Sequence, residues 1–284
     1  MDRRGFLRAL AAGGALSLAG CLGGSGEGEP PLADESLTVA TATTVHDSGL
    51  LAELAAGFEG EFGASLRPVV RGTGAALRTA RDGDCDAVLV HAPPLEAEFV
   101  AAGHGVNRRA VMANDFLVVG PPDDPTEAAG SDPLAAFRAI AAGDAAFRSR
   151  GDRSGTHVRE RRLWREAGVE PAGEWYRETG QGMGATLVAA DEAGAYTLVD
   201  RGTFLNTETS LVAHVAHGLE DPPELLRNEY SVIPTNPARD VAYALAMAFV
   251  GYLTGPARER IDDFRVDGER AFRPVGVTDP ADEP

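Results

Sequence analysis

The sequence predicts an α/β protein with two lobes. Short apolar strands alternate with amphipathic helices from Ser36 onward, and 44% of the residues are hydrophobic, which is typical of a globular chain. A chain of 284 residues is long for a single core and suits two lobes of ordinary size. We expect a first lobe over residues 36–116, a second over 117–231 and a return to the first over 232–284.

The beginning of the chain has the features of an export signal, which takes no part in the fold. Arg3 and Arg4 form a twin-arginine pattern, and an apolar run follows them. The run is too short to remain as a membrane-spanning helix. The Leu-Ala-Gly-Cys segment that ends at Cys21 resembles a lipobox, in which cleavage frees this cysteine for lipidation. Residues 1–21 therefore predict a twin-arginine lipoprotein signal peptide with a lipobox.

The next segment predicts how the mature chain is attached. Residues 22–35 are rich in Gly, Glu, Ser and Pro, a composition typical of a flexible tether. Together with the signal, this predicts a lipid anchor on the outer face of the cytoplasmic membrane. Because Cys21 is lipidated in this interpretation, Cys85 has no disulfide partner, and no metal-binding or catalytic spacing surrounds it. We expect Cys85 to be a small buried residue.

The chain is strongly acidic. Its formal net charge is −17, and all 26 of its basic residues are arginine. This charge argues against nucleic acid as a partner and fits a halophilic protein that stays soluble in concentrated salt, where screening weakens self-repulsion. An anion-binding site in such a chain needs a local cluster of hydrogen-bond donors, because the overall field is unfavourable.

Three strands in the first half of the chain each lead into a helix. The expected strands are Leu37–Ala40, Leu66–Val70 and Ala87–Val90, and the helices begin at Ser48-Gly49, at Gly72-Thr73 and after Pro93-Pro94. In open α/β sheets, the carboxyl ends of the strands line the ligand crevice. Thr43, Thr44 and Thr73 follow two of these strands, so they are either helix caps or a rim of hydrogen-bond donors.

The second half continues this alternation, and two helices then return to the first lobe. The expected elements are strands at Phe116–Val119, Phe147–Ser149, Ala195–Val199, Leu211–Val215 and Ser231–Ile233, and helices at about 134–143, 156–167, 184–192, 239–253 and 256–265. The chain is expected to cross between lobes near Ala113–Phe116 and near Val232–Asn236. Gly180–Gly184 does not match the dinucleotide pattern G-x-G-x-x-G, so it is either a tight turn or a close backbone approach to a small ligand.

The turn within Phe147–His157 carries the clearest functional signal. A short β-prone piece precedes the turn, and a helix is expected to begin at about Thr156. The first turn of a helix has free N–H groups and the positive end of the helix dipole. Arg150 and Ser154 add a guanidinium and a hydroxyl, which also donate hydrogen bonds. The stretch is therefore either a receptacle for an anion or an N-capped helix with a surface arginine.

These residues resemble a known family, the tungstate-binding components of ABC transporters, over about Leu37 to Pro274. The matching stretches are Thr43-Thr44, Ser48-Gly49-Leu50-Leu51, Gly72-Thr73-Gly74-Ala75-Ala76-Leu77, Val90-His91-Ala92-Pro93, Asn114-Asp115-Phe116, Ser149–His157, Trp175-Tyr176, Gly180–Gly184, Tyr196-Thr197-Leu198 and Asp200-Arg201-Gly202-Thr203. The resemblance implies a periplasmic-binding-protein type II fold. In that fold each lobe is a mixed β-sheet flanked by helices, and an oxyanion binds in the cleft between the lobes.

The resemblance also implies which residues bind the oxyanion. Carried over residue by residue, the ligand-binding set is Thr43, Thr44, Thr73, Arg150, Ser154, Gly155 and Thr156, with Gly182, Met183, Asp200 and Arg201 as additional candidates. The sequence departs from the family pattern at Ala42 and Val45, where hydroxyl residues are usual, and at Arg71, which replaces a small or apolar residue. The departures leave open which first-turn threonine contacts the ligand and whether Arg71 adds a second cation.

The function implied by the resemblance is the capture of tungstate outside the cell. The expected partners are an ABC transporter permease and its ATPase, and the protein is expected to be a monomer without a cofactor or a metal site. Molybdate and phosphate are alternative ligands. Tungstate and molybdate carry no proton at neutral pH, whereas hydrogen phosphate carries one and prefers an acceptor in the site. Asp47, Asp152 and Asp200 are either such an acceptor, helix caps or partners of Arg150.

A secreted hydrolase is the alternative from another functional class. Ser48, His91 and His157 would then be a nucleophile and bases, or His157 and Glu160 would bind a metal. Neither a G-x-S-x-G nor an H-E-x-x-H pattern supports these roles. The three-residue spacing of His157 and Glu160 is one that helices make on any surface. The sequence therefore predicts a binding protein and not an enzyme.

Overall fold

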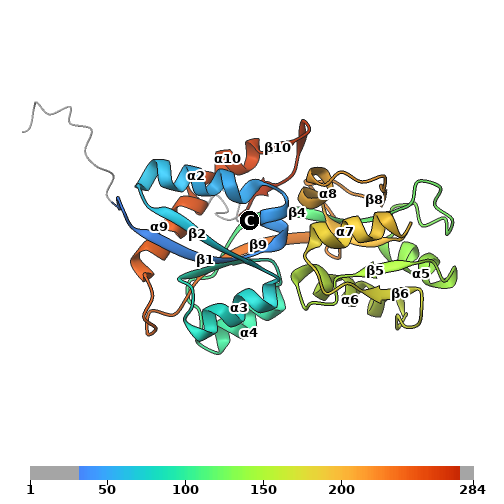
Figure 1. Ribbon diagram of the computed structural model, residues 1–284, viewed down its shortest axis with the longest axis horizontal. Helices are drawn as coiled ribbons and strands as arrows, with labels where there is room; N and C mark the ends of the chain where they lie inside the picture. The colour runs from blue at the N-terminus through green and yellow to red at the C-terminus, as the bar shows by residue number, and fades with distance from the viewer. Residues whose placement is uncertain (1–31, 276–284) are drawn as a thin grey trace, which may run out of the picture.

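The computed structural model describes residues 32–275, which form two lobes side by side (Figure 1). The long strand β4 (Arg109–Gly120) passes from the first lobe into the second, and β9 (Arg227–Pro234) returns beside it. The signal peptide expected over residues 1–21, including Cys21, lies outside the described residues, as does most of the expected tether.

The first lobe contains a mixed sheet in the order β12-β4-β9-β3-β1-β2. Its parallel strands are β1 (Ser36–Ala42), β2 (Ser65–Arg71) and β3 (Ala87–Val90). β9, β4 and β12 (Arg273–Pro274) extend the sheet with antiparallel pairing. All four residues of β3 are buried, in keeping with its uninterrupted apolar sequence in the middle of the sheet.

Helices cover both faces of this sheet (Figure 1). α2 (Leu50–Phe62), α9 (Tyr243–Thr254) and α10 (Ala257–Asp263) pack on one face, and α3 (Thr73–Asp82) and α4 (Pro93–Ala101) pack on the other. In the larger core, Phe58 packs edge-on against Phe249, with ring centroids 5.2 Å apart. A small hairpin of β10 (Arg265–Val266) and β11 (Glu269–Arg270) follows α10.

The second lobe is built on the distal half of β4. β7 (Thr197–Asp200) and β8 (Val212–Val215) pair antiparallel with it, and β5 (Phe147–Ser149) pairs parallel with β6 (Tyr176–Glu178). The helices of this lobe are α5 (Pro133–Ala142), α6 (Gly155–Ala167), α7 (Met183–Glu192) and α8 (Arg201–Asn206). Trp164 lies at the centre of the core, with its ring 4.3 Å from that of Phe137 and 5.1 Å from that of Phe147.

β4 is much longer than the strand expected at Phe116–Val119, because Asn114 and Asp115 form part of the strand. Both side chains are buried and find partners inside the protein. Asn114 Nδ2 donates to Asp200 Oδ2 at 3.5 Å, and Asp115 accepts hydrogen bonds of 2.6 and 3.0 Å from the guanidinium of Arg201. The boundary expected at residue 232 falls inside β9, whose pairing with β4 begins at residue 227.

Several short elements were not expected from the sequence, and α1 and β6 are two of them. α1 (Thr43–Asp47) was not expected, because its β-branched residues Thr43, Thr44 and Val45 have low helix propensity and five residues show no periodicity. β6 was not expected because only its pairing with β5 identifies it. The helix expected from residue 239 begins at Tyr243, since Ala242 N instead donates to Asp86 Oδ1 at 2.7 Å.

A buried carboxyl group lies under the aromatic core of the second lobe. Glu160 Oε1 accepts a hydrogen bond of 3.1 Å from Trp164 Nε1 and one of 2.8 Å from the Tyr176 hydroxyl. Burial raises the pKa of Glu160 to about 7, although these hydrogen bonds favour its ionised form. A carboxyl whose pKa is raised on folding stabilises the protein fully below its unfolded-state pKa and loses that contribution as the pH rises through the folded-state pKa.

We predict that Glu160→Gln removes this pH dependence while keeping an acceptor oxygen for Trp164 and Tyr176. The free energy of unfolding of the variant, relative to that of the original protein, should rise by roughly 2–3 kcal/mol between about pH 4 and about pH 8. Urea unfolding of both proteins at the two pH values measures the difference. A difference in stability that does not change with pH would contradict a buried, titrating Glu160.

Candidate functional site

Four helices begin in the region between the two lobes. β1 leads directly into α1, β2 leads through Gly72 into α3, the turn after β5 leads into α6, and Gly182 precedes α7. The amide groups of a first helical turn have no carbonyl partner within their own helix. The longer helices also place the positive ends of their dipoles there. The region therefore offers many backbone donors to a ligand.

Contacts across the cleft bring these helix starts together. Arg150 Nη1 of the second lobe donates to Thr43 Oγ1 of the first at 2.9 Å. Gly184 N donates to Asp47 Oδ2 at 3.0 Å, and Asn206 Nδ2 donates to Asp47 O at 2.9 Å. Since these bonds join residues from different lobes, the structure has its lobes closed on each other.

Among residues 32–275, several buried polar atoms have no hydrogen-bond partner, and three of them concern these helix starts directly. They are Thr73 Oγ1, Arg150 Nε and Thr156 Oγ1, on side chains that are at most 2% exposed. Thr73 begins α3, and Thr156 lies in the first turn of α6. An unsatisfied buried donor costs about 1–3 kcal/mol, and more if it is charged. A ligand rich in acceptor atoms would satisfy all three.

The guanidinium of Arg150 is held in place from two sides. Besides its bond to Thr43, its Nη2 donates to Asp152 Oδ2 at 2.6 Å. Burial alone would raise the pKa of Asp152, but the charge of Arg150 and hydrogen bonds from Ser154 outweigh it, so the pKa of Asp152 is lowered. Asp152 therefore stays ionised and fixes the guanidinium of Arg150. The Nε atom of Arg150 remains available to a ligand.

Ser154 and Gly155 shape the start of α6. Ser154 is the N-cap, and its Oγ accepts a hydrogen bond from His157 N at 3.2 Å. A Cβ added to Gly155 would lie 2.5 Å from His91 O, so only glycine allows α6 to approach the first lobe so closely. A Cβ on Gly72 would likewise lie 3.4 Å from Ser154 Cβ, which shows that the starts of α3 and α6 are in contact.

A chain of hydrogen bonds fixes the proton of the Thr44 hydroxyl. Asn228 Oδ1 can only accept, so His91 Nδ1, 2.8 Å away, carries the proton. Burial lowers the pKa of His91 to about 4, which keeps the ring neutral. His91 Nε2 is then an acceptor, and Thr44 Oγ1 donates to it at 3.3 Å. Thr44 therefore has no proton left for a ligand.

The hydroxyl of Thr43 has the opposite role. Its Oγ1 accepts from Arg150 Nη1 at 2.9 Å and from Met183 N at 3.4 Å. Both partners are donors, so the hydroxyl proton of Thr43 is free for a third group. Of the two first-turn threonines, Thr43 is thus the one that has a hydrogen to offer an anion.

The four additional candidates fall into two groups. Gly182 and Met183 lie beside Thr43, because a Cβ on Gly182 would be 3.5 Å from Thr43 Cγ2 and Met183 N donates to its hydroxyl. Asp200 is instead the N-cap of α8 and accepts from Thr203 N and Oγ1 at 3.1 and 2.7 Å. The side chain of Arg201 is bound to Asp115, behind the cleft.

The asparagine pair behind the cleft was missed by sequence reasoning. Asn228 Nδ2 donates to Asn114 Oδ1 at 2.8 Å, and Asn114 in turn donates to Asp200. These residues connect His91 to Asp200, and burial raises the pKa of Asp200 to about 6. Their signal in the sequence is weak: Asn114 interrupts the apolar run of β4, whereas Asn228 stands between the charged Arg227 and Glu229 in β9. Arg71, whose role was left open, is exposed.

The arrangement gives no support to the metal-site and hydrolase alternatives. His157 Nδ1 accepts from Arg153 N at 3.0 Å, whereas Glu160 is buried against Trp164 and Tyr176. Within residues 32–275, no group of three or more His, Cys, Asp or Glu side chains is placed to hold a metal ion. Across the same residues, no helix combines the length and apolar character needed to cross a membrane.

Comparison with known proteins agrees with this geometry. The sequence model of the family described as the PBP superfamily domain matches residues 25–257. A putative ABC transporter anion-binding protein of Haloferax volcanii is 47% identical over 98% of this chain and 87% of its own length. The tungstate-binding protein TupA of Peptoclostridium acidaminophilum is 42% identical, with 80% of each chain covered. The chain belongs to the TupA family of the PBP superfamily.

The TupA family also accounts for the fold. The crystal structure of the tungstate ABC transporter from Geobacter sulfurreducens superposes with a TM-score of 0.72 at 44% sequence identity, covering 79% of this chain and 96% of that one. The relatives are binding proteins of transporters, so membership of the TupA family confirms the expectation of a binding protein and excludes the hydrolase alternative. The two-lobed mixed α/β fold expected from the resemblance is likewise confirmed.

We predict that Thr43→Val and Thr44→Val have different consequences. Thr43→Val should lower the affinity for an oxyanion such as tungstate by about tenfold or more, because it removes a donor to a charged group. Thr44→Val should mainly lower the melting temperature, because it leaves His91 Nε2 buried without a partner. Titration calorimetry and thermal unfolding separate the two effects. Equal losses of affinity in the two variants, with equal melting temperatures, would contradict the assigned proton positions.

Proposed function

We propose that this protein captures tungstate in the cleft between its lobes and delivers it to an ABC transporter. The observation that carries the proposal is the set of three buried, unpartnered polar atoms, Thr73 Oγ1, Arg150 Nε and Thr156 Oγ1. They belong to both lobes, and an anion between them would accept from each. The names of the relatives from Peptoclostridium acidaminophilum and Geobacter sulfurreducens supply the identity of the anion.

The surroundings of the cleft favour an anion without a proton. Each of the three carboxylates that were candidates for accepting a proton is already engaged. Asp47 accepts from Gly184 N, Asp152 from Arg150 and Ser154 N, and Asp200 from Thr203. Tungstate and molybdate need only donors, whereas hydrogen phosphate would have to displace one of these bonds. We therefore place tungstate and molybdate ahead of phosphate.

Closure of the lobes explains how the ligand is retained. Thr43, Thr44 and Thr73 belong to the first lobe, and Arg150, Ser154, Gly155 and Thr156 to the second. Only the closed state supplies donors from both lobes, so a bridging anion stabilises that state. β4 and β9 are the two connections about which the lobes would open. Gly182 and Met183 would complete the enclosure beside Thr43.

The route of export and the anchor are part of the proposal. The twin-arginine pattern and the lipobox support export by the twin-arginine route and lipidation of Cys21, with the protein held on the outer face of the cytoplasmic membrane. The partners would be a permease and its ATPase, since the Haloferax volcanii relative is named as an anion-binding protein of an ABC transporter. A single anchored copy is sufficient, because one chain supplies both halves of the site.

We predict that Arg150→Ala weakens tungstate binding by roughly tenfold to more than a hundredfold, since a hydrogen bond to a charged group contributes about 1.5–3 kcal/mol. Arg150→Lys should restore only part of the affinity, because lysine lacks the planar fork. Titration calorimetry with tungstate, molybdate, sulfate and phosphate provides the measurement, and the exposed Arg67→Ala is the matched control.

The same titrations test the identity of the ligand. The unaltered protein should bind tungstate at least as tightly as molybdate, and both far more tightly than sulfate or phosphate. A donor ring sized for the larger anions makes longer and weaker contacts with the smaller ones. Phosphate binding as tight as that of tungstate would contradict the assignment, and unchanged tungstate affinity in Arg150→Ala would remove Arg150 from the site.

We predict that Cys21→Ser releases the protein into the medium or leaves it unprocessed, because serine cannot receive the lipid through a thioether bond. Membrane and medium fractions of cells expressing each form give the measurement. One lipid chain can be a weak anchor, so the fractions should also be compared in cells that lack the transporter. Gel mobility separates the processed form from the unprocessed form. Equal membrane retention in those cells of the original protein and of a variant whose signal peptide has been removed would show that Cys21 is not the anchor.

A further inference from the structure

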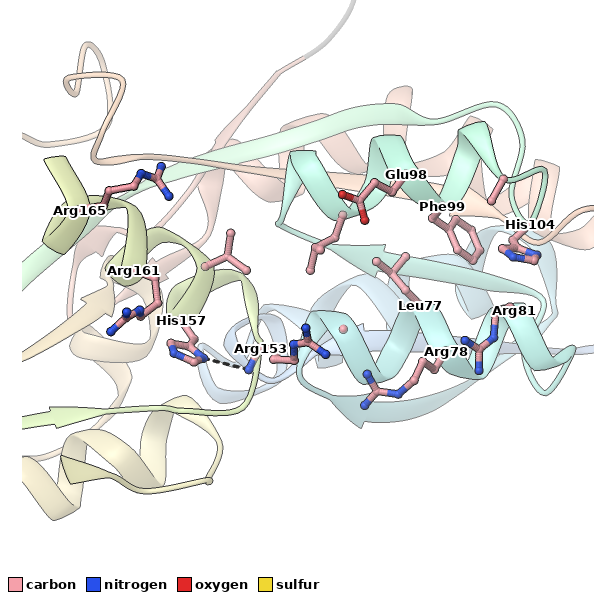
Figure 2. A pocket seen from close by; sticks show the side chains of 14 residues that line it. Leu77, Arg78, Arg81, Glu98, Phe99, His104, Arg153, His157, Arg161 and Arg165 are labelled. Atoms are coloured by element: carbon pink, nitrogen blue, oxygen red, sulfur yellow. Dashed lines mark hydrogen bonds between the residues drawn. The ribbon is translucent and has the colours of Figure 1, made fainter. Parts of the chain in front are cut away.

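A second, strongly basic depression lies beside the anion site on the outer surface of the closed protein. It has a volume of about 640 Å³ and is lined by Arg78, Arg81, Arg153, Arg161 and Arg165 (Figure 2). We call it the basic groove. Five arginines in one groove are unexpected in a chain whose net charge is −17.

The charge of the basic groove is only partly neutralised within the protein. Arg81 pairs with Asp82, and Arg161 pairs with Glu170, and neither acid lines the groove. In the part of the chain that the structure describes, Arg78, Arg153 and Arg165 are exposed and form no ion pair. Among the described residues, the one acidic side chain that lines the groove is Glu98. The groove is therefore a local positive surface.

The floor of the basic groove is apolar. Leu77 and Phe99 are largely buried at its base, with Leu95 and Val158 beside them. Figure 2 shows Leu77 and Phe99 between the arginines of α3 and the acidic Glu98 of α4. A small oxyanion uses donors and has no use for an apolar floor, whereas a peptide segment with both acidic and apolar side chains matches floor and rim together.

The basic groove exists in this form only when the lobes are closed. Arg78 and Arg81 belong to α3 in the first lobe, whereas Arg153 and Arg165 belong to the second. The two walls meet where a Cβ on Gly74 would lie 3.1 Å from Arg153 O. Opening of the cleft would separate the two sets of arginines. A partner that binds both walls would therefore distinguish the closed protein from the open one.

The basic groove is also directly coupled to the anion site. Gly74 follows Thr73, and Arg153 lies between Asp152 and Ser154 in the turn that precedes α6. Arg153 has a backbone φ of 59°, which non-glycine residues adopt rarely, and its N–H donates to His157 Nδ1 at 3.0 Å. Its side chain is directed outward into the groove (Figure 2). Elements that touch the ligand thus also form the walls of the groove.

We propose that the basic groove is the docking surface for an acidic, partly apolar segment of the transporter's membrane subunit, which it binds only in the closed, anion-loaded state. This inference rests on the proposed function, because it assigns a surface for the partner of that function. The partner is identified by its chemistry: carboxylates for the unpaired arginines of both lobes and an apolar side chain for the floor.

The test uses the full protein, loaded with tungstate, and the permease–ATPase complex of the same transporter reconstituted in nanodiscs. Arg78→Glu/Arg165→Glu reverses one charge on each wall. Arg67→Glu/Arg239→Glu makes the same change in net charge at exposed arginines that do not line the groove. Biolayer interferometry measures docking, ATPase stimulation measures the productive complex, and titration calorimetry measures tungstate affinity. Thermal unfolding verifies that each variant is folded.

The groove variant should lose about tenfold or more in docking affinity relative to the original protein, and its stimulation of the ATPase should fall with it. Its tungstate affinity should stay within about threefold of that of the original protein. The control should dock within about twofold of the original protein. Unchanged docking in the groove variant, or an equal loss in the control, would overturn the proposal. So would light scattering that shows the original protein as a dimer and the groove variant as a monomer, because the groove would then hold a second copy.

The outcomes separate this inference from the proposed function. If the original protein does not bind tungstate in the calorimeter, the proposed function fails whatever the docking result. If tungstate binds and the groove variant docks normally, the proposed function stands and the docking surface fails. Docking of the original protein that is equally tight with and without tungstate would overturn the requirement for the closed state.

Discussion

The closed structure depends on a buried positive charge between the lobes. Arg150 is 2% exposed, and a charge removed from water to this extent is tolerated only when partners surround it. Asp152 neutralises one side, and the Thr43 hydroxyl accepts from the other across the cleft. Within the described residues, the Nε atom of Arg150 still lacks an acceptor. An anion at that position would complete the set of partners, which ties closure of the lobes to occupancy of the site.

A second chain of hydrogen bonds reaches the connections between the lobes. Thr44 donates to His91, His91 to Asn228, Asn228 to Asn114, and Asn114 to Asp200. Asn114 and Asn228 face each other in the register of β4 and β9, the two strands about which the lobes would move. Thr44 is therefore oriented by a network that runs through the hinge strands. The loop that contains Arg153 links the anion site to the basic groove. Binding of the anion and docking of the membrane subunit would therefore depend on the same closure of the lobes.

Local signals in the sequence were sufficient for much of this picture. The spacing of apolar residues identified most strands and helices. The turn before α6 indicated either an N-capped helix or an anion receptacle, and the structure shows Ser154 as the N-cap. The sequence did not reveal α1, because its β-branched residues form a helix only under tertiary contacts. It did not reveal the full length of β4, because the pairing of Asn114 and Asp115 with Asp200 and Arg201 joins positions far apart in the chain. The different roles of Thr43 and Thr44 could be assigned only from the hydrogen-bond partners of each hydroxyl in the structure.

The central claim is that one tetrahedral oxyanion lies among donors from both lobes. Crystals grown with tungstate and measured above the tungsten L-edge test it most directly, because anomalous scattering locates the metal atom without assumptions about the protein. We predict a single strong peak within hydrogen-bonding reach, through its oxygens, of Thr73, Arg150 and Thr156. A peak elsewhere, or no peak in a crystal whose lobes are closed as described, would contradict the account.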